Sequence, residues 1–199
     1  MTFTPNTVLN LVVQTIKSPQ EGASTILSMG LARNVLMQLL GLVVVASVIT
    51  GQLGVFAMGG GLQDGAMTGP FLMSPMIATF VQFALLIVLI TSVHVIGRAL
   101  GGRGSFEETL SLVIWLQFIL LCLQVVQILA LILFPVLGAL IGLVSIVLFF
   151  WLLVNFIAVI HGFTSLGLVL VGVIISAFGI LFAMSLILAM LGLSFPGSL

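Results

Sequence analysis

A short polar loop, Gly101-Gly102-Arg103-Gly104-Ser105-Phe106-Glu107-Glu108, opens the stretch that decides the fold of this chain. After it, the residues from Leu110 to Ile160 include no Asp, Glu, Lys or Arg, and Pro135 divides them near the middle. One membrane crossing needs about 20 apolar residues, so a run of about 51 is too long for one helix and fits two. The sequence therefore predicts a transmembrane hairpin, with helices over 106–134 and 135–160 and a tight turn at Pro135.

The composition of the whole chain agrees with this interpretation. Hydrophobic residues make up 62% of the sequence and charged residues 4%, whereas soluble domains carry about 25% charged residues. A transmembrane barrel would alternate apolar and polar residues over segments of about ten. The apolar runs here are continuous, so we expect an all-α, polytopic transmembrane helix bundle.

Two spans are expected before the hairpin and one after it, which gives five spans over 34–57, 74–98, 106–134, 135–160 and 164–191. A loop over 62–70 with its lone Asp64, and a short tail ending at Leu199, complete this transmembrane domain of residues 34–199. Residues 1–33 form a separate N-terminal region of two short interfacial helices. Ser18-Pro19-Gln20-Glu21 predicts a capping box at the start of the second, and Ser105 with Glu108 predicts another at the start of the third span.

The basic residues predict one orientation. With a cytoplasmic N-terminus, the cytoplasmic side holds all four of them: Lys17, Arg33, Arg98 and Arg103. The opposite side then holds Asp64, the Pro135 turn and the uncharged tail, as the positive-inside rule requires. The C-terminus is therefore expected on the periplasmic side.

Charge and cysteine content exclude several partners. Four basic and four acidic residues balance to zero, which argues against nucleic acid and leaves the lipid bilayer, other membrane proteins or a second copy as partners. Cys122 is the only cysteine, so neither a disulfide within the chain nor a cysteine metal site is expected. No cleavable signal peptide is evident at the N-terminus.

Polar side chains inside the spans are the first candidate site. Gln117, Gln124 and Gln127 share one helix face at about 100° per residue, and Asn155 lies on the next span. We favour hydrogen bonds between helices, each contributing about 0.6–2 kcal/mol. The alternative is a polar pathway for a small solute, lined by the glutamines of the third span.

Small residues are the second candidate. Gly138 and Gly142 form a GxxxG pattern that Ser145 extends, and Gly172 with Ser176 repeats the spacing of four on the last span. Such faces let helix backbones approach closely. They predict packing within the chain, with a dimer interface as the alternative.

The third candidate is a cluster at the cytoplasmic ends of the spans: His94, Arg98, Arg103, Glu107, Glu108 and His161. Two histidines and two carboxylates are suitable metal ligands, but span-end histidines are common in the wet interface and the glutamates suit a helix N-terminus. We therefore expect no metal, no cofactor and no catalytic residue. The sequence has no G-x-S-x-G, H-E-x-x-H or P-loop motif, and the protein is predicted not to be an enzyme.

Three segments together resemble a known family. They are Thr15-Ile16-Lys17-Ser18-Pro19-Gln20-Glu21-Gly22-Ala23, the 101–108 loop with the Thr109-Leu110-Ser111-Leu112-Val113-Ile114-Trp115 run, and Phe150-Trp151-Leu152-Leu153-Val154-Asn155-Phe156-Ile157-Ala158-Val159-Ile160-His161-Gly162. This pattern is similar to the Yip1-domain family of five-span membrane proteins and covers nearly the whole chain. The features that carry the resemblance are the distribution of hydrophobic residues, the glycines and the spacing between them.

The resemblance implies a location and a kind of function. Eukaryotic relatives are linked to Rab-type GTPases and vesicle traffic, but this chain has no long cytosolic N-terminal region and lacks their Asp-Leu-Tyr-Gly-Pro motif. It looks like the short bacterial branch, which implies a bacterial inner membrane. The expected role is a scaffold, assembly or accessory subunit acting through helix packing. A small transporter or channel remains the alternative.

Overall fold

The structure is a computed structural model that describes residues 5–57 and 74–190. These residues form seven α-helices and no strand, which confirms the all-α fold class. The predicted loop at 62–70, with Asp64, and the tail after Leu191 lie outside the described residues. The helices are α1 Pro5–Lys17, α2 Pro19–Ser28, α3 Arg33–Ala57, α4 Pro75–Ala99, α5 Phe106–Leu133, α6 Pro135–His161 and α7 Leu166–Met190.

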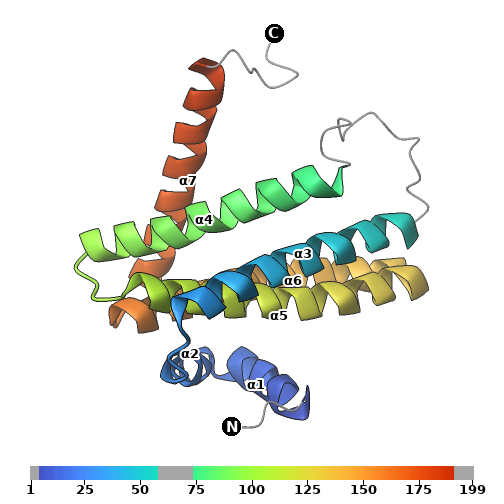
Figure 1. The fold of residues 1–199 in the computed structure, drawn as a ribbon, viewed down its shortest axis with the longest axis horizontal. Helices are drawn as coiled ribbons and strands as arrows, with labels where there is room; N and C mark the ends of the chain where they lie inside the picture. Colours follow the sequence, from blue (N-terminus) through green and yellow to red (C-terminus); the bar gives the residue numbers. More distant parts are fainter. Residues whose placement is uncertain (1–4, 58–73, 191–199) are drawn as a thin grey trace.

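The helices α5 and α6 form the predicted hairpin at the centre of the fold (Figure 1). Phe134 alone separates them, and Pro135 occupies the first helical position of α6. Proline suits that position because its missing N–H would have no partner in the first turn of a helix. Close packing continues along the hairpin, since a Cβ added at Gly138 would overlap Leu131 of α5.

Two hydrophobic cores lie on either side of α5. One joins α3 and α4 to α5 through fully buried side chains such as Leu40, Ile90 and Leu110. The other joins α5 and α6 to the N-terminal helices, and Val12 and Ala23 are buried in it together with Phe156. The two short N-terminal helices therefore pack against the bundle, below α5 and α6 in Figure 1. Their position at a membrane interface stays a prediction.

Among residues 5–57 and 74–190, four helices are long and apolar enough to cross a membrane. They match the first four predicted spans and comprise Arg33–Phe56, Pro75–Ala99, Phe106–Leu133 and Pro135–His161. The apolar part of α7 that the structure describes with side chains, Leu166–Phe182, falls below the length of a span. The structure thus supports an integral membrane protein of at least four spans, and the fifth span stays a prediction.

One of the two predicted capping boxes forms and the other does not. At the start of α5, Glu108 N donates to Ser105 Oγ at 3.1 Å and Ser105 N donates to Glu108 Oε2 at 2.7 Å. The box predicted at Ser18 is wrong, because Ser18 makes no side-chain cap bond. The backbone N–H of Ser18 already donates to Gln14 O of α1 at 2.7 Å. It is therefore not free to donate to the Glu21 carboxylate, as a capping box requires.

Candidate functional site

Two of the three predicted glutamines hold α3 against α5. Gln117 Nε2 donates to Ser47 Oγ at 3.4 Å, and Gln124 Nε2 donates to the Ser47 backbone oxygen at 3.3 Å. Ser47 is buried and donates its own hydroxyl to Val43 O at 2.8 Å. A polar group in a bilayer interior is stabilised when it finds a partner on a neighbouring helix. Ser47 is that partner. Its position in the sequence alone did not identify it as one.

The third glutamine faces α6. A Cβ added at Gly142 would lie 2.7 Å from Gln127 Nε2, so this glycine makes room for the amide. Gln124, Gln127 and Ser145 line a small open cavity of about 280 Å³ between α5 and α6, with Leu120, Ile146 and Phe149 as its apolar walls. Gln117 does not line this cavity.

Asn155 lies apart from the glutamines and connects α6 to α2. It is buried, its Nδ2 donates to Trp151 O at 2.8 Å, and its Oδ1 accepts from Gln20 Nε2 at 3.2 Å. A second polar contact joins α1 to α5, where Trp115 Nε1 donates to Thr15 Oγ1 at 3.1 Å. Sequence reasoning missed Gln20 and Thr15 as partners, because nothing local relates them to residues 135 and 100 positions away.

His161 is enclosed by glycines where α4, α5 and α6 meet. It is 4% exposed, and its Nε2 lies 3.1 Å from Val93 O; since a carbonyl only accepts, Nε2 carries the proton. A Cβ added at Gly97 or Gly102 would overlap the imidazole, and one at Gly104 would lie 3.1 Å from its Cε1. Gly97 and Gly102 therefore create most of the space for this ring, while Gly104 lies beside it and makes room mainly for Ile160. The ring holds the α4–α5 connection against the end of α6. We call this end of the bundle the His161 end.

The other predicted members of the cluster also lie at the His161 end, but they serve separate contacts. His94 packs edge-on against Phe106 at 5.9 Å between ring centroids, and the Arg33 guanidinium lies 5.5 Å from the same ring. Glu108 belongs to the capping box, while the remaining members are exposed: Arg98, Arg103 and Glu107. Within residues 5–57 and 74–190, no three His, Cys, Asp or Glu side chains gather as a metal site would require.

The two predicted small-residue patterns differ in what they contact. Gly138 and Gly142 both pack inside the α5–α6 hairpin, where Gly138 contacts Leu131 and Gly142 contacts Gln127. On α7, by contrast, a Cβ added at Gly172 or Gly179 would meet no atom within 4 Å. At these two glycines α7 therefore makes no close contact with another helix in the part of the chain that the structure describes.

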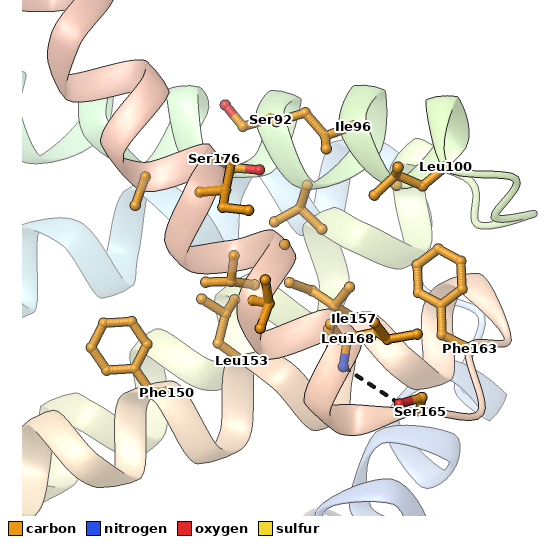
Figure 2. Close-up of a pocket in the computed structure, with 18 of the residues that line it drawn as sticks. Ser92, Ile96, Leu100, Phe150, Leu153, Ile157, Phe163, Ser165, Leu168 and Ser176 are labelled. Atoms are coloured by element: carbon orange, nitrogen blue, oxygen red, sulfur yellow. Dashed lines mark hydrogen bonds between the residues drawn. The ribbon is translucent and has the colours of Figure 1, made fainter.

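A groove of about 630 Å³ runs between α4, α6 and α7, and Figure 2 shows its lining. Its walls are mostly apolar, with Leu153 and Ile157 of α6 facing Ile96 of α4 and Leu168 of α7. We call it the α4–α6–α7 groove. Its few polar lining residues are Ser92, Thr164, Ser165 and Ser176. Sequence analysis did not predict the groove, although two of its lining residues, Gly172 and Ser176, carried the signal of an open helix face.

One end of the groove lies at the His161 end of the bundle, and we call it the mouth. Phe163 lines it, and the Phe163 ring lies 5.6 Å from the His161 ring. Beside it, α7 begins, and Ser165 Oγ accepts a hydrogen bond from Leu168 N at 3.4 Å (dashed in Figure 2). The arrangement is suited to binding an apolar ligand or helix along the groove, with polar groups available only at its mouth and at two serines.

Comparison with known proteins identifies a family for this chain. A family model, described as the Yip1 domain, matches residues 13–187. No curated protein and no solved structure gives a significant match. The matched range runs from α1 through α7 and includes the hairpin, the His161 end and the groove. The chain therefore belongs to the Yip1 domain family of membrane proteins.

Proposed function

We propose that the protein is a non-enzymatic scaffold, assembly or accessory subunit that acts by packing its helices against other membrane proteins or a second copy. The observation that carries this proposal is α7, which makes its main contacts with α6 and extends away from the other helices (Figure 1). Lipid tails are as apolar as leucine, so helix association in a membrane depends on close packing at small residues. Gly179 offers such a site beyond the groove, with no described atom within 4 Å of an added Cβ.

The finer topology is part of the same proposal. We place α7 as a fifth span, because the whole helix, Leu166–Met190, has 25 residues. That is long enough to cross a bilayer, although its shorter part Leu166–Phe182 is not. The N-terminus is then cytoplasmic and the C-terminus periplasmic, which puts Arg98 and Arg103 on the cytoplasmic side. A bacterial inner membrane belongs to the same proposal, because the chain resembles the short bacterial branch of the family.

Site-specific photocrosslinking in native membranes tests the scaffold function. A photoreactive residue replaces Phe178 on α7 in one protein and Val147 on α6 in the control; the two side chains are 71% and 70% exposed. We expect a discrete protein adduct from position 178 that co-purifies in stoichiometric amount and is lost in Gly179→Leu. Lipid adducts alone at both positions would contradict the proposal.

A small transporter or channel is the second candidate, favoured by the cavity that Gln124, Gln127 and Ser145 line. Its test is solute flux into proteoliposomes, with glycerol and urea as neutral probes. A transporter predicts flux that falls in Gln127→Leu but not in Gln117→Leu, because Gln117 lies outside the cavity. Flux no greater than in empty vesicles would remove this candidate.

A further inference from the structure

The burial of the α5–α6 hairpin changes part-way along its length. On α5, residues 109–114 are six consecutive buried residues, and on α6, residues 152–158 are seven. Six successive residues point in every direction around a helix of 3.6 residues per turn, so protein surrounds the hairpin on all sides here. Nearer the turn, outward side chains are exposed instead, as at Ile132 and Val144. The hairpin therefore has an enclosed part at the His161 end and an exposed, apolar part towards its turn.

Two hydrogen bonds fix the level of the N-terminal helices along the hairpin. Thr15 Oγ1 accepts from Trp115 Nε1 at 3.1 Å, and Asn155 Oδ1 accepts from Gln20 Nε2 at 3.2 Å. Trp115 is the tenth residue of α5, and Asn155 lies six residues before the last residue of α6. At 1.5 Å per residue, these contacts lie roughly 9–14 Å from the ends of the two helices at the His161 end.

The outer face of α1 and α2 carries charge at this level. Lys17 follows Thr15 by two residues, Glu21 follows Gln20 directly, and both charged side chains are exposed. A charged side chain within the hydrocarbon is costly, and the few that occur face a bundle interior or a water-filled cavity. Lys17 and Glu21 face outwards, so the level at which α1 and α2 contact the hairpin lies at the edge of the hydrocarbon core or outside it.

The opposite end of the hairpin is apolar to its tip. Leu133, Phe134 and Val136 are 70%, 65% and 76% exposed. The charged residues that the structure describes all lie in α1 and α2 or at the His161 end: Lys17, Glu21, Arg33, Arg98, Arg103, Glu107 and Glu108. Large apolar side chains at a tip are stabilised by lipid and not by water. The tip therefore belongs at the far edge of the hydrocarbon core and not in the water beyond it.

The distance between these two levels equals the thickness of a bilayer core. From Pro135 to Asn155, α6 rises roughly 30 Å, and from Trp115 to Leu133, α5 rises roughly 27 Å. The hydrocarbon core of a bilayer is about 30 Å thick. The complete helices have 28 and 27 residues, so each is roughly 40 Å long and exceeds the core by about 10 Å. Trp151 is half-exposed just inside the same level, where tryptophan is enriched in membrane proteins.

We propose that the hydrocarbon core covers the hairpin only from its turn to the level of Trp115 and Asn155, and that the enclosed part forms a headpiece with α1 and α2 in the adjoining headgroup layer. The outer face of this headpiece, defined by Gln14, Lys17 and Glu21, is the surface that meets the lipid headgroups. Its one cation and one anion match zwitterionic headgroups, which carry a phosphate and an ammonium group. The proposal does not depend on the scaffold function, because it concerns only the depth of the chain in the bilayer.

Electron paramagnetic resonance of spin labels in phosphatidylcholine bilayers tests the proposal. In the full-length Cys122→Ser chain, a single label replaces Gln14, Val136 or Val144, which are all exposed; Val144 lies well inside the hydrocarbon in any arrangement. The Gln14 label should collide with a neutral, water-soluble nickel chelate at least about tenfold more often than the Val144 label, because polar solutes partition poorly into hydrocarbon. The Val136 label should collide mainly with dissolved oxygen. A chelate-exposed Val136 label, or a Gln14 label as protected as the Val144 label, would overturn the proposal.

A matched pair of charge variants gives a second test that needs no label. Gln14→Glu adds a carboxylate to the outer face of the headpiece, and Val144→Glu adds one to the exposed middle of α6. Val144→Glu should lower the thermal midpoint in bilayers by roughly 5–10 °C, because its charge lies in hydrocarbon. Gln14→Glu should leave the midpoint unchanged, because its charge lies among headgroups. An equal loss in the two variants would contradict the proposed depth.

Discussion

Replacing Gly97 by alanine tests the packing of His161 at the point where three helices meet. Gly97 lies in α4, and a Cβ there would overlap the His161 imidazole. The ring cannot move aside freely, because Gly102 and Gly104 of the following loop pack against it. Any displacement also breaks the contact of Nε2 with Val93 O at 3.1 Å.

The expected loss is the sum of three terms. Forcing a methyl group into a packed site costs about 1–3 kcal/mol, and losing one hydrogen bond costs about 0.5–1.5 kcal/mol. Alanine is favoured over glycine within a helix by about 1 kcal/mol, which offsets part of this. The free energy of unfolding of Gly97→Ala should therefore fall by about 2 kcal/mol, a change of about thirtyfold in the folding equilibrium.

The assay is equilibrium denaturation of the full-length protein in detergent micelles, followed by circular dichroism. Gly172→Ala is the matched control: its Cβ meets no atom, so the helix term alone should raise stability by up to about 1 kcal/mol. In a double-mutant cycle with His161→Ala, the cost of Gly97→Ala should shrink by at least about 1 kcal/mol. The reasoning is refuted if Gly97→Ala is as stable as Gly172→Ala, or if the two substitutions at 97 and 161 are additive.

Three further predictions concern single hydrogen bonds. Gln124→Leu should lower the free energy of unfolding by about 0.6–2 kcal/mol, through loss of the bond to the Ser47 carbonyl, with normal membrane insertion in a fractionation assay. Asn155→Leu leaves Gln20 without its partner, so limited proteolysis should release the N-terminal helices faster than in the wild type; equal cleavage rates would show that apolar packing alone holds them. Ser105→Ala should cost about 1 kcal/mol by removing the α5 cap, and Ser105→Thr should retain most of it.

A capping-box sequence predicted the start of a helix correctly only where the backbone N–H of the capping serine was not already hydrogen-bonded. Ser105 precedes α5 as its N-cap in an extended conformation, so its N–H and hydroxyl both serve the capping box with Glu108. Ser18 carries the same pattern, but α1 continues into it and takes its N–H. The difference lies in the preceding helix and not in the four residues of the motif.

The polar residues show a similar division. The shared face of Gln117 and Gln124 was predictable from helix geometry, and both residues do meet the same serine. Gln127, three residues further along, reaches α6 instead, and Asn155 reaches α2. Helix periodicity gives the direction of a side chain on its own helix, but the neighbouring helix on that side depends on the whole fold.

The sequence by itself determined that this chain forms membrane-spanning helices, where the central hairpin turns, and which polar and small residues lie within the spans. These follow from local physics, because a backbone in lipid must satisfy its hydrogen bonds within each helix and Pro135 can only begin a new one. The tertiary structure decided that three glycines enclose His161, that Ser47 receives two glutamines, and that α7 leaves a groove beside α4 and α6. Each of these depends on contacts between residues far apart in the chain, and no local pattern specifies which helices will meet.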